Sequence, residues 1–314
     1  MNLKRLELRI SNECSSRCSF CYLQTFNNCS CGNTIEHIRR ATQIVEENDF
    51  TELTISGGDI FDLSCYSTEI ESELAKFFDA ILNKMNDGKL NKLILETSLM
   101  HKAPFDFFNI RRVLDKADLS KVIVRTSYDT EGRFTEESLQ QWTNEVVALS
   151  SEYGSLQKQC NIVMTQAFID AIKSGFNLKE LKDIGISEFK FLVPTCGYDS
   201  SDWDSDFCRK EDWNEELGLH FFPKRASFIS ILPILNEQLG DEAIKKMFAR
   251  EDYPDNLIYW IEDTECWYPF NSDAEFNDFI GTVDVDNGYI DSNEPMRNDV
   301  IKYCSDRMKC ESGI

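Results

Sequence analysis

Strand and helix patterns alternate along the first 193 residues of this 314-residue chain. Short apolar runs predict strands, and apolar residues at three- and four-residue steps predict the helices between them. A repeated strand–helix order favours a parallel sheet with right-handed connections, and six such units suit a partial, TIM-like barrel of the α/β class. The predicted strands cover residues 6–10, 52–56, 92–98, 122–127, 159–165 and 188–193. The predicted helices cover residues 34–47, 69–85, 105–116, 136–150 and 168–184, the last broken near Gly175.

Three cysteines lie on the loop that follows the first predicted strand. Cys14, Cys18 and Cys21 have the spacing Cys-x3-Cys-x2-Cys, which suits a four-iron, four-sulfur cluster with one iron left open. An open iron can bind a substrate, whereas a structural zinc site needs a fourth ligand. The alternative is a zinc site completed from elsewhere, with Cys29 or Cys31 as the nearest donors.

A second motif, Gly57-Gly58-Asp59, ends the second predicted strand, and the residue before the last clustered cysteine is the aromatic Phe20. With these two motifs the chain resembles the radical S-adenosylmethionine (SAM) superfamily. That family is marked by Cys-x3-Cys-x-aromatic-Cys after the first barrel strand and by a Gly-Gly-Glu-like motif ending the second. The resemblance covers roughly residues 1–195, and it departs from the family at Asp59, where Glu is commoner.

The resemblance implies where the cofactor binds. In the family the open iron holds the amine and carboxylate of SAM, and the backbone of the glycine motif contacts the amine. Polar groups on strands four and five hold the ribose and carboxylate, and backbone near the end of strand six holds the adenine. Both motifs fall at carboxyl ends of strands, where active sites of such sheets lie. The cofactor-binding candidates are Phe20, Gly57, Gly58, Asp59, Ser98, Arg125 (carboxylate), Ser127 (ribose hydroxyl) and Val193 (adenine).

The resemblance also implies a reaction: reductive cleavage of SAM at a [4Fe–4S] cluster, giving a 5′-deoxyadenosyl radical that abstracts hydrogen from a substrate. A peptide is the favoured substrate, by family analogy alone, with a small metabolite or a nucleotide as the alternative. A non-catalytic iron–sulfur or zinc protein is the alternative from another class. Cys160 and Cys196 are candidates for a hydrogen donor or a substrate ligand, and a packing role is favoured for each.

The chain changes character after the sixth predicted strand. We expect a barrel over residues 1–195 and a smaller α+β extension over residues 196–314 that caps the barrel mouth. The extension contains a predicted helix over residues 237–249. It also contains a predicted hairpin, whose strands 279–285 and 289–290 flank an Asp-Asn-Gly turn.

This predicted hairpin weakly resembles the SPASM and twitch extensions of radical SAM enzymes, which bind auxiliary iron–sulfur clusters. A cysteine commonly follows the turn in those extensions, and here that position is Asp291. We therefore expect a degenerate, cluster-free version. The ligands of a loaded version would come from Cys266, Cys304 and Cys310.

Charge and hydropathy restrict the partners. A formal net charge of −22 argues against unspecific binding to DNA or RNA, which needs Lys and Arg. No apolar run suits a membrane span, and the alternating N-terminal segment lacks the core of a signal peptide, so we expect a cytoplasmic protein. Lys4, Arg5, Arg9 and Arg17 lie around the cysteine loop. We predict that this basic patch docks an acidic electron donor such as flavodoxin or ferredoxin.

Overall fold

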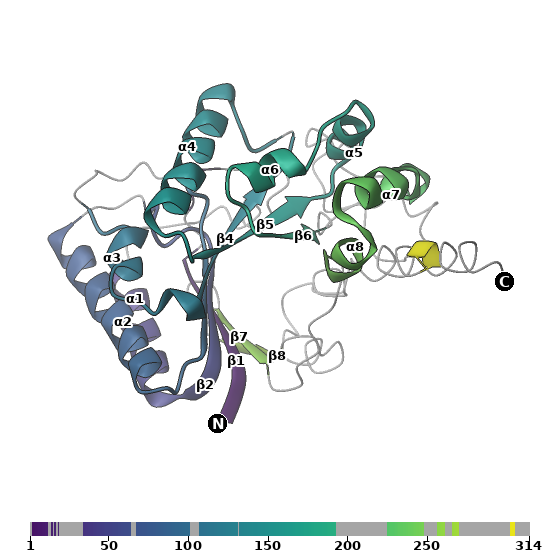
Figure 1. The fold of residues 1–314 in the computed structure, drawn as a ribbon. Helices are drawn as coiled ribbons and strands as arrows, with labels where there is room; N and C mark the ends of the chain where they lie inside the picture. Colours follow the sequence, from purple (N-terminus) through teal and green to yellow (C-terminus); the bar gives the residue numbers. More distant parts are fainter. Residues whose placement is uncertain are drawn as a thin grey trace, which may run out of the picture.

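Eight strands of the described chain form one open sheet in the order β6-β5-β4-β3-β2-β1-β7-β8 (Figure 1). The computed structural model describes residues 2–11, 14, 16, 18, 34–63, 67–100, 107–130, 132–192, 225–247, 256–260, 266–269 and 302–304. The strands are β1 (Asn2–Ser11), β2 (Asp49–Gly57), β3 (Lys92–Glu96), β4 (Val122–Tyr128), β5 (Gln157–Val163), β6 (Glu188–Leu192), β7 (Asn256–Trp260) and β8 (Cys266–Pro269). Strands β1 to β6 are parallel, β7 is parallel to β1, and β8 is antiparallel to β7.

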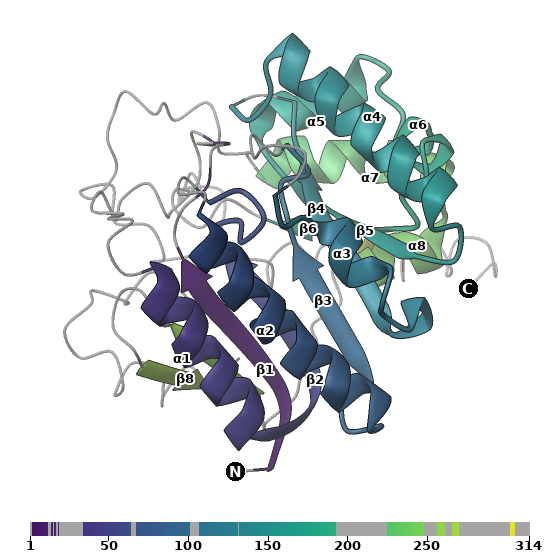
Figure 2. The ribbon, with the colours of Figure 1, turned by 90° about the vertical axis from the view of Figure 1, so that its left-hand side faces the viewer.

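Helices follow each of the first five strands, which confirms the predicted α/β order. They are α1 (Thr34–Glu47), α2 (Thr68–Asn86), α3 (Ile110–Leu114), α4 (Glu136–Glu152), α5 (Gln166–Lys173) and α6 (Lys179–Asp183). Figure 2 shows α1 and α2 side by side along β1 and β2. In the described part of the chain, no helix combines the length and hydrophobicity that a membrane span requires.

Local signals explain where these helices begin and end. The Ser67 side chain caps α2 by accepting a hydrogen bond from the Ile70 backbone N–H, and Thr135 and Ser138 form a capping box at α4. Helix α3 is shorter than the predicted 105–116, because the Asn109 side chain caps it at Ile110. The break predicted near Gly175 is confirmed, since that glycine has a φ of 105° between α5 and α6.

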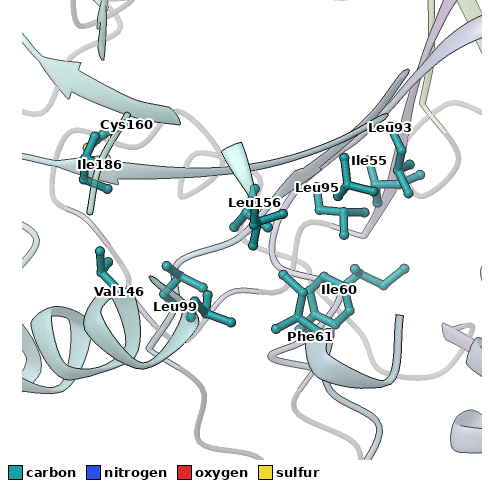
Figure 3. Packing of buried hydrophobic residues seen from close by; sticks show 14 of the residues in the cluster. Ile55, Ile60, Phe61, Leu93, Leu95, Leu99, Val146, Leu156, Cys160 and Ile186 are labelled. Atoms are coloured by element: carbon teal, nitrogen blue, oxygen red, sulfur yellow. The ribbon is translucent and has the colours of Figure 1, made fainter. Parts of the chain in front are cut away.

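One hydrophobic cluster fills the space between the strands and the helices (Figure 3). Strand β1 contributes Leu6, Leu8 and Ile10 to it, so alternate residues of the same strand point to the opposite face of the sheet. Phe78 of α2 stacks on the rings of Phe61 and Phe108, at centroid distances of 5.5 and 5.4 Å. The helices therefore cover one face, and the other face is left for polar groups.

The segment after residue 195 differs from the prediction. The helix expected over 237–249 is wrong in its start and its continuity, because α7 (Arg225–Leu239) and α8 (Asp241–Met247) meet at Gly240, which has a φ of 86°. Strand β7 pairs with β1, a pairing between distant segments that no local pattern indicated. The predicted hairpin at 279–290 lies outside the described residues, and the proposed domain boundary at 195 stays a prediction.

Candidate functional site

A layer of polar side chains crosses the face of the sheet opposite the helices. The strand register places Arg9, Ser56, Glu96, Arg125, Gln159 and Glu188 at one level of β1 to β6. The Nη1 of Arg125 donates to Glu96 Oε1 at 2.8 Å, its Nε donates to Gln159 Oε1 at 2.5 Å, and Gln159 Nε2 donates to Glu188 Oε2 at 3.3 Å. This is unlike a closed barrel, whose interior is filled mainly by branched aliphatic residues.

The glycine motif directly contacts the strand that leads into the cysteine loop. The backbone N–H of Gly58 donates to the carbonyl oxygen of Ser11 at 2.6 Å, close to where the β1–β2 register shifts. Gly57 has a φ of 101°, and a Cβ added there would lie 2.7 Å from that same oxygen. Only glycine satisfies both the backbone conformation and this close approach. The two sequence motifs therefore meet at the carboxyl end of β1 and β2.

Asp59 binds the end of β2 to the end of β3. Its Oδ2 accepts hydrogen bonds from Thr97 Oγ1 at 3.0 Å and from both the N–H and the hydroxyl of Ser98 at 2.7 Å, while Oδ1 accepts from the Phe61 N–H at 3.0 Å. The residue is 1% exposed. These bonds explain why β3 ends at Glu96 rather than at the predicted Ser98. They also give the Asp59 and Ser98 side chains a structural role in the loop that carries the glycine motif.

Replacing Asp59 by asparagine is expected to destabilise the protein by about 2–3 kcal/mol, because an amide NH2 must then face at least one buried donor. Urea unfolding followed by circular dichroism measures the loss. The matched control is Asp118→Asn, which changes an exposed aspartate that also accepts bonds from a hydroxyl and a backbone N–H, both of Ser120. Equal midpoints for the two variants would contradict the role assigned to Asp59.

Two of the three clustered cysteines lie in the described residues, and an arginine contacts one of them. Cys18 is buried, and Nη1 of Arg133 donates toward its sulfur at 3.6 Å. Burial and the negative charge of Asp59 raise the pKa of the Cys14 thiol, while Ser16 and the positive charge of Arg133 act in the opposite direction. Metal binding deprotonates such thiols, so buried sulfurs next to a cation suit metal ligation.

These features fit an iron–sulfur cluster. Two soft sulfur donors lie on one loop at the edge of the sheet, and both are free thiols, with Arg133 contacting the Cys18 sulfur. The third predicted ligand, Cys21, lies outside the described residues, as do Phe20 and Val193. The three cysteines would hold the cluster, and its chemistry would be supplied next to the glycine motif.

Glu7 lies below the glycine motif on the polar face of β1. Its Oε1 accepts from Ser56 Oγ at 2.6 Å and from Arg9 Nε at 2.9 Å. Burial raises the pKa of Glu7, but the charge of Arg9, the Ser56 hydroxyl and the charge of Arg5 outweigh it, so the pKa is held below its ordinary value of 4.5. A carboxylate with a lowered folded-state pKa stabilises the fold above its unfolded pKa, and this contribution is lost as the pH falls through the folded pKa.

We therefore expect the free energy of unfolding to fall as the pH drops below 4.5, and Glu7→Gln to flatten part of this dependence. At neutral pH the variant is expected to lose about 3 kcal/mol, because Arg9 and Arg5 lose a buried anion. Urea unfolding over a pH series tests this, with Glu46→Gln, an exposed glutamate of α1, as the control. A Glu7→Gln protein with the wild-type pH slope would disprove the assignment.

The structure corrects the predicted basic patch. Arg5 and Arg9 are only 3% and 8% exposed and lie on the polar face of β1, so neither offers a surface to an electron donor. The prediction of exposed arginines was wrong because alternation along a strand does not show which face of the sheet is exposed to solvent. The side chain of Lys4 and the whole of Arg17 lie outside the described parts of the chain.

The other candidates occupy the expected strand ends. Ser127 lies on β4 in register with Asn161 of β5, two residues beyond Arg125 on the polar face. Arg125 is already bonded to Glu96 and Gln159; a guanidinium carries five donors, so a carboxylate contact stays a prediction. Cys160 is fully buried in the hydrophobic cluster on the helix side (Figure 3), which is the environment of a packing residue.

Three further cysteines bear on the auxiliary cluster. Cys304 is fully buried and belongs to the hydrophobic cluster, which is the environment of a packing residue. Cys266 begins β8, and Cys310 lies outside the described residues, as does Cys196. The cluster-free extension therefore stays a prediction.

Arg133 is the site residue that sequence reasoning missed. It lies between β4 and α4, in the Gly132-Arg133-Phe134 segment that follows the polar end of β4. Loops after the carboxyl ends of parallel strands commonly carry functional residues, but the candidates predicted here, Arg125 and Ser127, lie on the strand itself. Extending the rule to the whole loop would have found Arg133.

The chain is similar to several solved protein structures. No family model and no curated protein matches the chain. Native anSMEcpe with bound AdoMet and Cp18Cys peptide matches at 14% identity and a TM-score of 0.48, over 77% of this chain and 61% of that one. Streptococcus suis SuiB bound to S-adenosylmethionine matches at 12% and 0.43, over 88% and 66%. Escherichia coli coproporphyrinogen III oxidase (HemN), described as a radical SAM enzyme, matches at 10% and 0.45, over 82% and 63%.

The chain spans less than two thirds of the length of each of these three proteins. At such identities and TM-scores these similarities do not assign a function, so the function is inferred from the residues of the site. Those residues are the cysteine loop, the glycine motif and the polar layer of the sheet.

Proposed function

We propose that this protein is a radical SAM enzyme, which cleaves SAM reductively at a [4Fe–4S] cluster to start hydrogen abstraction from a substrate. The observation that carries the proposal is the contact between the glycine motif and the last residue of β1, which leads into the cysteine loop. The Gly58 N–H bonds the Ser11 carbonyl at 2.6 Å, three residues before Cys14. A purely structural metal site has no use for a glycine pair packed against its ligand loop.

Each motif has a defined part in this proposal. Cys14, Cys18 and Cys21 would hold the cluster as thiolates, and three protein ligands would leave it able to bind SAM. Gly57 and Gly58 present backbone rather than side chain at this edge of the sheet. When bound, the cluster and SAM supply a 5′-deoxyadenosyl radical by one-electron cleavage of a C–S bond.

The protein's own task is to orient SAM and to keep water away from the reacting atoms. Arg125 and Ser127 are the proposed partners of the SAM carboxylate and ribose, and backbone at Val193 is proposed for the adenine. Asp59 is proposed to hold the loop of the glycine motif in place and not to contact SAM, because its carboxylate already accepts bonds from Thr97, Ser98 and Phe61.

The substrate and the electron donor belong to the same proposal. A peptide is the proposed substrate, and a small metabolite or a nucleotide is the alternative. The proposed reductant is an acidic protein such as flavodoxin or ferredoxin in the cytoplasm. With Arg5 and Arg9 buried, Lys4 and Arg17 are the basic residues left from the predicted docking patch.

Anaerobic purification followed by iron and sulfide analysis, and then by addition of dithionite and SAM, tests the proposal. We expect about four irons per chain and formation of 5′-deoxyadenosine. Zinc in place of iron, with no SAM cleavage, would instead favour the non-catalytic metal protein. A content of about eight irons would restore the auxiliary cluster and make Cys266, Cys304 and Cys310 its candidate ligands.

A further inference from the structure

A guanidinium from a distant loop lies against the cysteine loop. Nη1 of Arg133 is 3.6 Å from the sulfur of Cys18, across a sequence separation of 115 residues. Arg133 lies on the loop between β4 and α4, whereas Cys18 follows β1, which is three strands away in the sheet. The contact thus joins two loops at the same edge of the sheet.

The surroundings of Arg133 fix its direction. Its guanidinium carbon lies 5.6 Å from the centroid of the Phe134 ring, and that ring packs on Tyr128 and Trp142, each at 5.7 Å. Trp142 is anchored in turn, because its Nε1 donates to Thr126 Oγ1 at 2.9 Å. An aromatic group attached to β4 and α4 therefore holds the arginine in place beside the sulfur.

One nitrogen of the Arg133 guanidinium is left unpaired among the described residues. Its Nε is buried and makes no hydrogen bond within the described part of the protein. A cation that is held by packing and aimed at sulfur is poorly explained as a surface ion pair.

We propose that Arg133 is a positioning residue that raises the reduction potential of the cluster, by donating an N–H···S hydrogen bond from Nη1 to the Cys18 sulfur. This inference rests on the proposed function, which supplies the cluster. Reduction adds one electron from the external donor to the cluster and takes up no proton, so the reduced cluster is more negative. A cation and an N–H donor at a ligand sulfur stabilise that state most, since hydrogen bonds to sulfur and local charge set cluster potentials.

The proposal distinguishes a redox role from simple packing. A packing residue would change the stability of the loop and leave the potential of an intact cluster unchanged. A hydrogen-bond donor with a full charge changes the potential itself. The potential of the loaded protein, measured without SAM, therefore separates the two roles and does not depend on catalytic activity.

The experiment compares wild type, Arg133→Gln and Arg133→Lys after anaerobic cluster reconstitution, using an electrochemical titration followed by electron paramagnetic resonance. At a fixed potential, Arg133→Gln is expected to lower the ratio of reduced to oxidised cluster about tenfold, which is about 59 mV for a one-electron couple. Arg133→Lys keeps the charge but loses the planar donor, so a smaller drop of about threefold is expected.

Arg112→Gln is the matched control. Its guanidinium also lies over a phenylalanine ring, 5.8 Å from the centroid of Phe108, and it pairs with Glu71 at 2.6 Å on the helix side of the sheet. It makes a comparable cation–π contact, and its ion pair is with a carboxylate of α2. Its variant is expected to keep the wild-type potential.

The outcomes are separable. Loaded Arg133→Gln with the wild-type potential would overturn the inference and leave the proposed function intact. If Arg133→Gln does not hold a cluster, Arg133→Lys decides, since a lowered potential supports the inference and a wild-type potential overturns it. A wild-type protein that binds no iron–sulfur cluster would overturn the proposed function, and this inference with it.

Discussion

Replacing Cys18 by alanine is expected to abolish SAM cleavage, with 5′-deoxyadenosine falling more than about 100-fold after anaerobic reconstitution. Changes to groups that only support a metal ligand already cost about 10- to 100-fold, so loss of a ligand costs more. Cys18 is buried, and Arg133 contacts its sulfur. A thiol at the protein surface therefore cannot easily replace it as a ligand. Iron content and product formation are measured on the same samples.

The matched control for this variant is Cys160→Ala, which removes another buried thiol. Cys160 lies on the helix side of β5, in the hydrophobic cluster, and we place it outside the site. This variant is expected to lose about 1 kcal/mol of stability through the small cavity it leaves. It should retain the cluster and the cleavage activity. A Cys18→Ala protein with full iron and wild-type cleavage would remove the cysteine loop from the proposed mechanism.

Replacing Gly57 by alanine has the second largest expected effect. Gly57 has a φ of 101°, a backbone conformation that alanine rarely adopts. The added Cβ would also lie 2.7 Å from the carbonyl oxygen of Ser11, which is a backbone atom and cannot rotate away. The strands must separate at the point where Gly58 bonds Ser11. We expect a loss of about 3 kcal/mol in the free energy of unfolding, together with weaker SAM binding by the loaded protein.

Gly88→Ala separates the cost of the positive φ from the cost of the close approach. Gly88 has a φ of 71°, but a Cβ there would meet nothing within 4 Å. It therefore carries only the conformational cost of a left-handed alanine, about 1 kcal/mol. Urea unfolding and SAM binding are measured for both variants. If Gly57→Ala were no more destabilised than Gly88→Ala, the close approach of Gly57 to the Ser11 carbonyl would be disproved.

Much of the fold was predictable because its signals are local. The stripe of apolar residues in α2 and the short apolar runs of β2 to β6 depend on neighbours in sequence, so the predicted segments overlap the observed ones. The prediction was poorest after residue 195. There Gly240 divides a helical pattern, and β7 pairs with a strand some 250 residues earlier. Pairing between distant segments leaves no periodic signal in either one.

The candidate site divides in the same way. The amino-acid sequence by itself determined that Cys14, Cys18 and Cys21 share a loop and that Gly57-Gly58-Asp59 ends a strand, because each motif is defined by its spacing. Only the tertiary structure decided which groups these motifs contact. Gly58 bonds Ser11, the Asp59 carboxylate accepts hydrogen bonds from Thr97 and Ser98, and Arg133 donates to the sulfur of Cys18. These contacts join segments that lie tens of residues or more apart. A parallel sheet brings such segments together because it collects the carboxyl ends of its strands at one edge.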